Sequence, residues 1–129
     1  MSRPDDVKYT VTHEWARLEG DVVTVGITDY AVEQLSDLAF VDLPESGVSL
    51  EKGSRFGEIE STKTVADLIA PVSGEVVEAN TEVVENLELL THSPFADGWL
   101  VKIRLSDPGE LSGLMEAVAY QAHVDAEDH

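Results

Sequence analysis

The stretch EIESTKTVADLIAP, residues 58–71, contains two strand-like segments joined by a short polar turn. RFGEIE (55–60) and TVADLIA (64–70) flank the turn and leave Ser61, Thr62 and Lys63 as a tight connection. The apex of such a hairpin presents its side chains to solvent on a stiff support. Lysine ends a flexible stem in an amine that is a usual target of acylation, but a lone lysine in a turn is not specific, and the hairpin alone favours a plain solubilising lysine.

Most of the remaining chain is predicted to form short strands separated by turn residues. Many short strands with few helices predict a mainly β fold, either an antiparallel barrel or a sandwich. The predicted strands are VKYTVT (7–12), VVTVGI (22–27), LAFVDLP (38–44), GEVVEA (74–79) and GWLVKIRL (98–105).

Helical segments are fewer. TDYAVEQLSDL (28–38) has polar ends and apolar positions inside, and NTEVVENLELL (80–90) is ambiguous, with room for one helical turn. A C-terminal segment over 107–124 begins with a cap at Asp107, and Glu110 stands three residues later, as in a capping box. Gly113 can divide this segment into two short helices. Its packing face is expected at Leu111, Leu114, Met115, Val118 and Ala122.

The length of 129 residues predicts one domain, 1–129, with a core over about 7–105 and a frayed acidic tail at 125–129. The 26 acidic and 8 basic residues give a formal net charge of −18, which argues against nucleic-acid and anionic-membrane partners and suits basic patches on proteins. A merely soluble or salt-adapted surface explains this charge equally well.

The chain contains no cysteine, which excludes disulfides, thiolate nucleophiles and cysteine-based metal sites. The beginning of the chain, Met1 to Asp6, lacks the apolar run of a signal peptide, and no segment has the roughly 20 apolar residues of a membrane span. We therefore expect a cytoplasmic protein and a monomer.

Several segments, in this order and spacing, together resemble the glycine cleavage system H proteins, which carry lipoate. The resemblance extends from about Tyr9 to Tyr120. It implies a lipoyl/biotinyl-type flattened barrel, a barrel-sandwich hybrid, with short helices that include the C-terminal segment. The segments are THEWARLEGDVVTVGITDYA (12–31), LSDLAFVDLPESG (36–47), EIESTKTVADLIAPVSGEVVEAN (58–80), SPFADGWLVKI (93–103) and GELSGLMEAVAY (109–120).

The resemblance implies a non-catalytic carrier with lipoate joined by an amide to Lys63. It would shuttle the aminomethyl group of glycine from glycine decarboxylase to aminomethyltransferase, and dihydrolipoamide dehydrogenase would reoxidise the arm. Lipoate attachment enzymes are the further expected partners. Glu60, three residues before Lys63, is expected to take part in their recognition. Glu14 and Asp67 match acidic positions of the cleft that holds the loaded arm, and Thr12 a further polar one.

Other residues of the chain leave alternatives open. Thr62 and Thr64 flank Lys63 where the family often has Val and Ala, and Ser36 stands where Gly is usual. Such departures leave room for an H-like protein that relays lipoate to other lipoyl proteins. A biotin carrier is disfavoured because it usually has Met on both sides of its lysine, and a non-covalent acidic interaction module is a further class.

No nucleophile paired with a base is visible, so no catalytic residue is predicted. The histidines His13, His92, His123 and His129 are scattered along the sequence, so no metal site is predicted either. Trp15 and Trp99 are expected to pack in the core or at its rim.

Overall fold

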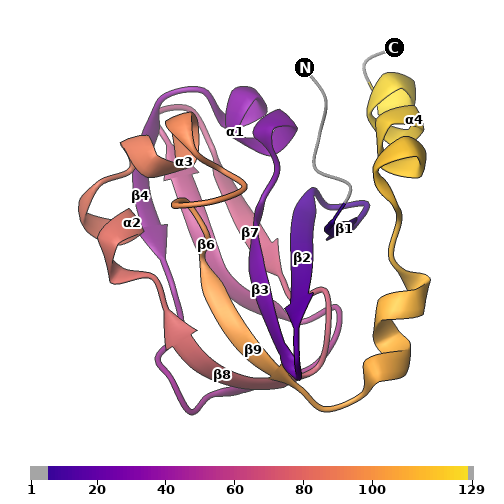
Figure 1. The fold of residues 1–129 in the computed structure, drawn as a ribbon. Helices are drawn as coiled ribbons and strands as arrows, with labels where there is room; N and C mark the ends of the chain where they lie inside the picture. Colours follow the sequence, from indigo (N-terminus) through magenta and orange to yellow (C-terminus); the bar gives the residue numbers. More distant parts are fainter. Residues whose placement is uncertain (1–5, 128–129) are drawn as a thin grey trace.

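The computed structural model describes residues 6–127, whose strands form two antiparallel sheets (Figure 1). One sheet has six strands in the order β1-β2-β3-β9-β8-β5, and the other has three in the order β4-β6-β7. The prediction of a mainly β fold with short helices is confirmed. The strands are β1 (Lys8–Tyr9), β2 (Glu14–Glu19), β3 (Val22–Ile27), β4 (Leu38–Asp42), β5 (Ser49–Leu50), β6 (Arg55–Ser61), β7 (Val65–Ile69), β8 (Gly74–Ala79) and β9 (Val101–Leu105).

The helices are short and lie around the two sheets. They are α1 (Asp29–Leu35), α2 (Thr81–Glu85), α3 (Glu88–His92), the 3-10 helix η1 (Pro108–Gly113) and α4 (Ala117–Glu127). The ambiguous stretch 80–90 thus holds one short helix and the start of another. Within the described residues no helix is long and apolar enough to cross a membrane.

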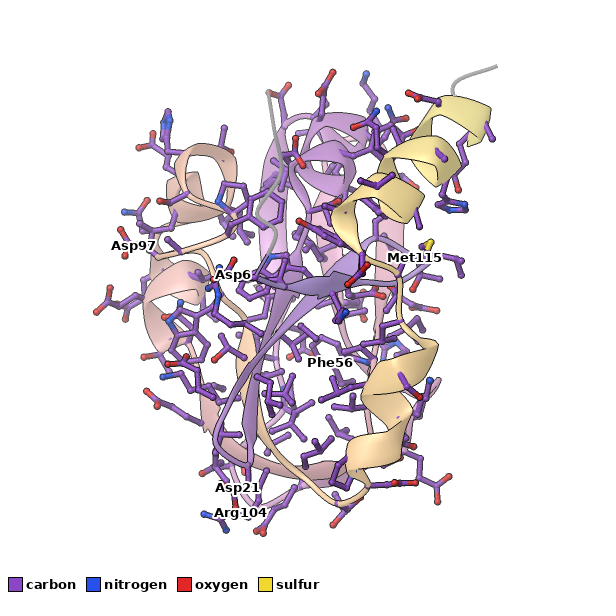
Figure 2. The ribbon with its side chains drawn as sticks, turned by 45° about the vertical axis from the view of Figure 1, so that its right-hand side comes forward. Asp6, Asp21, Phe56, Asp97, Arg104 and Met115 are labelled. Carbon is purple, nitrogen blue, oxygen red and sulfur yellow. The ribbon has the colours of Figure 1, made fainter. Side chains whose placement is uncertain are left out.

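The main core lies between the two sheets, which form separate layers in Figure 1. Val41, Ile59 and Leu68 of the smaller sheet pack in one cluster with Val25 and Ile103 of the larger sheet. Successive residues of a strand point to opposite faces, so β7 and β9 each bury alternate side chains in this core, whereas β3 is buried on both faces. Phe56, labelled in Figure 2, is also buried in this cluster.

A second, aromatic cluster lies beneath α4. Tyr9 and Tyr120 stack with their ring centroids 4.7 Å apart, and Trp15 is fully buried beside them. The indole N–H of Trp15 donates to the carbonyls of Ile27 and Pro94, at 3.1 and 2.9 Å. This cluster attaches the C-terminal helix to β1 and β2, and it confirms the expected packing role of Trp15.

The N-terminal region differs from its prediction. Strand β1 ends at Tyr9, because the chain turns after it and places His13 at φ 73°. The following strand β2 was not predicted as a strand, since its first three residues are all buried and therefore lack the polar–apolar alternation of a half-buried strand. The turn at Gly20, with φ 66°, joins β2 to β3.

Helix α1 ends three residues before its predicted end. Thr28 caps its first turn by accepting a hydrogen bond from the N–H of Ala31 at 3.2 Å. At the other end Ser36 adopts φ 65° and ψ −119°, close to the first central position of a type II′ turn, which glycine dominates. The turn redirects the chain into β4, so Leu38 belongs to a strand rather than to the helix.

The C-terminal segment is divided at Gly113 as expected, but three details of its prediction are wrong. The carboxylate of Glu110 accepts from the N–H and hydroxyl of Ser73, at 2.6 and 2.8 Å, so it is not available for a capping box. Val118 is 85% exposed, and Tyr120 and Val124 carry the packing of α4 instead. Helix α4 continues to Glu127, so Asp125 does not begin a frayed tail.

Met1 to Asp5, Asp128 and His129 lie outside the described residues. Figure 2 shows Met115 in the connection between η1 and α4. Its backbone pairs with that of Tyr9 through two hydrogen bonds of 2.8 Å. This pairing holds the C-terminal segment along β1 and forms one wall of the cleft described below.

Candidate functional site

The β6–β7 hairpin places Lys63 at its exposed apex. Ser61 is buried at the end of β6, and its hydroxyl accepts from the N–H groups of Lys63 and Thr64, at 3.2 and 3.1 Å. The N–H of Ser61 donates to the Thr64 carbonyl at 2.8 Å, which closes the turn. The backbone of the lysine is thus held from both sides while its side chain faces solvent.

The apex is also attached to the rest of the fold. The N–H of Thr62 donates to the carbonyl of Asp37 at 2.9 Å, in the connection between α1 and β4. Figure 1 shows this end of the hairpin at the same end of the molecule as α1. A tight turn with both internal and external hydrogen bonds gives the lysine a firm base, as the sequence prediction required.

The outer face of the smaller sheet is rich in carboxylates. Glu60 lies opposite Val65 on β7 and Phe40 on β4, next to the lysine turn. Val65 and Phe40 are exposed, so the surface beside Lys63 combines an acid with two apolar side chains. A partner that recognises this neighbourhood would meet both kinds of group.

Asp67 lies on the same outer face, further along β7. Its carboxylate accepts from the Nε of Arg55 at 3.0 Å, while an amine of the same guanidinium contacts Glu58 at 2.6 Å. The Asp67 side chain is 62% exposed, so this ion pair contributes little to stability. Asp67 is therefore accessible, but it already has a cationic partner.

Glu14 has the opposite environment, because its side chain is buried with only 1% exposure. One carboxylate oxygen accepts from the hydroxyl of Thr10 at 2.8 Å and from that of Thr12, and the other accepts from the N–H of Ile69 at 3.2 Å. Residues far apart in the chain thus meet here, since β2 begins where β7 ends.

Burial is the dominant influence on this carboxyl group. Removing it from water disfavours the ionised form and raises the pKa of Glu14 from 4.5 to about 7, against the lowering effect of its hydrogen bonds to Thr12, Thr10 and Ile69. A carboxyl group with a pKa near neutrality changes its charge readily when a charged group approaches it. An incoming cation would favour the ionised form.

A cleft of about 250 Å³ adjoins these partners of Glu14. Thr10, Thr12 and Ile69 belong to its lining, together with Leu114 and Met115 from the C-terminal segment. The remaining lining residues are Tyr9, Val11, Lys52, Gly53, Ala70, Pro71 and Gly113. The cleft is thus mainly apolar, with the two threonine hydroxyls on the side of Glu14.

The structure brings only some of the predicted cleft residues together. Thr12 lines the cleft and donates to Glu14, whose carboxylate lies behind the two threonines. Asp67 is not among the lining residues and pairs with Arg55 instead. Lys63 is separated from Ile69 by the length of β7, which spans about 13 Å from Val65 to Ile69 at the usual rise of a strand.

Sequence reasoning missed Thr10 and the N–H of Ile69 as partners of Glu14. Strand periodicity could not have indicated Thr10, because residues 10–13 form a turn in which the His13 N–H donates to the Thr10 carbonyl at 3.1 Å. No local signal could have indicated Ile69, which is 55 residues away from Glu14. His13 and His123, which are far apart in the sequence, lie close together in the fold, with ring centroids 5.5 Å apart.

Fold and site together define a small two-sheet β protein that presents a lysine on a firmly held hairpin, with a mainly apolar cleft at the far end of β7. The sequence matches the family model described as "Glycine cleavage H-protein" over residues 7–127. The chain therefore belongs to the glycine cleavage H-protein family.

Individual relatives agree with this assignment. The chain is 52% identical over 126 residues to a glycine cleavage system H protein of Bacteroides fragilis, covering 98% of this chain and 100% of the relative. It is 50% identical to one of a Synechococcus species, covering 97% of each. A crystal structure of a glycine cleavage system H protein from Mycobacterium marinum superposes with a TM-score of 0.88 at 42% identity, over 95% of this chain and 99% of that chain.

Proposed function

We propose that this chain is the lipoyl carrier of the glycine cleavage system and that lipoate is joined to Lys63 by an amide. The observation that carries the proposal is the exposed apex of the β6–β7 hairpin, fixed by Ser61 and by the bond from Thr62 to Asp37, in a chain that matches the family over residues 7–127. A carrier lysine needs an accessible amine on a support that does not fold back over it.

The lipoyl group would supply a redox-active pair of sulfurs on which the aminomethyl group of glycine is carried. The expected partners are glycine decarboxylase, which would hand over the aminomethyl group, and aminomethyltransferase, which would accept it. Dihydrolipoamide dehydrogenase would then reoxidise the lipoyl arm. A tethered group makes each transfer within a complex effectively intramolecular. The chain itself supplies the tether, its support and a resting place, so we assign it a non-catalytic role.

The cleft beside Glu14 is the proposed resting place of the loaded arm. Its mainly apolar lining suits the aliphatic chain of the arm. The hydroxyls of Thr10 and Thr12, on the side of Glu14, suit the polar end of the loaded arm. An amine is cationic near neutral pH, so its approach would favour the ionised form of Glu14 over the protonated one. Rotation of the Thr12 hydroxyl away from Glu14 would open the carboxylate to a charge-assisted hydrogen bond.

This arrangement predicts how pH would affect retention of an amine. Below a pKa of about 7 Glu14 is mostly protonated, so it would have to release a proton before it could pair with the cation. Retention is therefore expected to strengthen as the pH rises through 7. Asp67, which is exposed and paired with Arg55, fits a role at the mouth of the arm's path better than a role inside the cleft.

The surface around Lys63 is the proposed recognition site of the lipoate attachment enzymes. Glu60 is placed between two exposed apolar side chains, Val65 and Phe40, on the face next to the turn. The net charge of −18 favours basic patches on all of these partners. We further propose a monomeric, cytoplasmic protein with one domain over 1–129, working without nucleic acid or membrane.

Intact mass of the chain from cells supplied with lipoate tests the proposal. We expect one lipoyl increment, mapped by peptide analysis to Lys63 and lost in Lys63→Arg. Lys102→Arg is a matched control, because it removes another partly exposed lysine without touching the hairpin, and it should keep the increment. A biotinyl increment would indicate a biotin carrier instead, and no increment would indicate the non-covalent module.

Reconstitution with the three partner enzymes separates the leading function from lipoate relay. The lipoylated chain should support glycine cleavage and CO2 exchange. A chain that is lipoylated but inactive in both reactions, and that passes lipoate to another lipoyl protein, would instead be the relay protein that the departures at Thr62, Thr64 and Ser36 leave open.

A further inference from the structure

Three potential metal ligands meet on the side of the molecule where α4 crosses the turn before β2. His13 comes from that turn, whereas His123 and Glu127 are four residues apart on α4 and so share one face of the helix. Their ligand atoms all lie within 4.8 Å of one another. This cluster has no place in the carrier function proposed above.

Both imidazoles point their Nε2 atoms at one carboxylate. His13 Nε2 lies 2.9 Å from one oxygen of Glu127, and His123 Nε2 lies 3.1 Å from the other. A tetrahedral ion with ligand bonds of about 2.0–2.1 Å keeps its ligand atoms roughly 3.3 Å apart. The two nitrogen–oxygen distances are close to this value, and all three ligand atoms lie within 4.8 Å of one another, so a movement of α4 that draws the two imidazoles together would admit an ion between the three side chains.

The environment of His13 supports a role as ligand. Its Nδ1 lies 2.7 Å from the hydroxyl of Tyr120, which in turn lies 2.6 Å from the hydroxyl of Thr28. In the metal-bound state Nδ1–H would donate to Tyr120 and Tyr120 to Thr28, and Nε2 would bind the metal after losing the hydrogen that Glu127 accepts in the ion-free state. Histidine ligands of metal sites are commonly oriented by such a partner on their second nitrogen.

The backbone also holds His13 in place. Its φ of 73° is uncommon for a residue other than glycine, and the turn is fixed by hydrogen bonds from the His13 N–H to the Thr10 carbonyl and from the Thr28 N–H to the His13 carbonyl, at 3.1 and 3.0 Å. Residues held in this region often serve a function, because the surrounding structure must stabilise them.

The cluster is open to an entering ion. The side chains of His13, His123 and Glu127 are 16%, 26% and 39% exposed, so they are neither sealed in the core nor fully hydrated. Two imidazoles and one carboxylate suit zinc and its neighbours Ni2+ and Cu2+, whereas Mg2+ and Ca2+ prefer sets made only of oxygen ligands. With three protein ligands, a fourth position would remain for water.

We infer that His13, His123 and Glu127 form a site for a zinc-class divalent cation, which clamps α4 onto the turn before β2. The consequence is local, because the same turn carries Thr10 and Thr12, the partners of Glu14. In the absence of an ion, Glu127 accepts from both imidazoles and the Val11 carbonyl lies 3.1 Å from His123 Nε2. The ion would replace these weaker contacts.

The test measures binding of Zn2+ to the full, untagged chain without lipoate by calorimetry in a non-chelating buffer. We expect one tight site. His123→Ala and Glu127→Gln should each weaken Zn2+ binding by at least roughly 10- to 100-fold, which is the usual cost of losing a group that only hydrogen-bonds a metal ligand. His92→Ala is the matched control because His92 is exposed and distant in sequence from the cluster, and it should leave the affinity unchanged.

A second measurement separates a clamp from cations held loosely by an acidic surface. Zn2+ should slow amide hydrogen exchange in α4 of the wild type but not of His123→Ala, and excess Mg2+ should not displace it. Zn2+ binding of equal strength in His123→Ala, or an α4 whose exchange is unaffected by Zn2+, would overturn the inference. Neither result depends on lipoylation, so the proposed carrier function would stand or fall separately.

Discussion

Replacing Glu14 by Gln should change the dependence of stability on pH in a way that isolates this one carboxyl group. Its pKa is raised from 4.5 to about 7 by burial, so the folded protein keeps a proton that the unfolded chain has already lost. Ionising Glu14 in the folded state therefore costs free energy, and the free energy of unfolding falls as the pH rises from about 4.5 to about 7.

The size of the effect follows from the two pKa values. A difference between 4.5 unfolded and about 7 folded corresponds to about 3 kcal/mol at pH 8, where the group is ionised in both states. Glutamine keeps the shape and stays neutral. Its carbonyl can accept from the Ile69 N–H, while its amide can donate to the hydroxyl oxygens of Thr10 and Thr12, so it avoids this cost.

Urea unfolding of wild type and Glu14→Gln at pH 5, 6, 7 and 8 provides the measurement. The difference between their free energies of unfolding should shift in favour of the variant by about 2.5 kcal/mol from pH 5 to pH 8, or roughly 10 °C in Tm. Other carboxylates titrate equally in both proteins and cancel in the difference. Glu33→Gln, at an exposed position of α1, serves as the control for losing one negative charge.

If the difference in the free energy of unfolding between Glu14→Gln and the wild type stays constant within about 0.5 kcal/mol from pH 5 to pH 8, this reasoning is refuted. That margin is the usual deviation from additivity for independent substitutions. The same variant tests the proposed cleft. Glu14→Gln should accept lipoate normally but lose its aminomethyl load to hydrolysis faster than the wild type, and an equal lifetime would remove Glu14 from the cleft's function.

Three further substitutions test other parts of the structure. Lys63→Arg should keep the Tm of the wild type within about 2 °C, because an exposed apex contributes little packing. The same variant should lose glycine cleavage completely, and residual turnover would rule out the proposed attachment site. Ser36→Gly should raise stability by about 1 kcal/mol by relieving a left-handed backbone, whereas Ser46→Gly, without a positive φ, should not stabilise. Gly26→Ala should cost about 1–3 kcal/mol, because its new Cβ would lie 2.6 Å from the ring of Trp15, and a neutral result in thermal unfolding would contradict this packing.

Much of the hairpin that carries Lys63 could be predicted from sequence alone. Strands β6 and β7 are adjacent in the chain, and their alternation, their turn residues and the position of the lysine are all local properties. The division of the C-terminal segment at Gly113 was local in the same sense. Resemblance added the expected fold and the expected role of Lys63 to what the pattern of residues indicated.

Contacts between distant segments could not be predicted in this way. Glu14 owes its raised pKa to burial beneath threonines of its own turn and to the end of β7, whereas in the sequence it is one acid among 26. Strand β2 was missed because burial on both faces removes alternation, and Glu110 was assigned to a cap because its actual partner, Ser73, is 37 residues away.

The sequence by itself therefore determined the local elements and the position of Lys63 at a hairpin apex, because hydrogen bonds between neighbouring residues and the period of the strands depend only on nearby residues. The tertiary structure alone decided that Glu14 is buried, that Asp67 pairs with Arg55 and that His13 meets His123 and Glu127. Those properties arise from desolvation and from contacts across more than 100 residues of chain, as between His13 and Glu127, which no local pattern records.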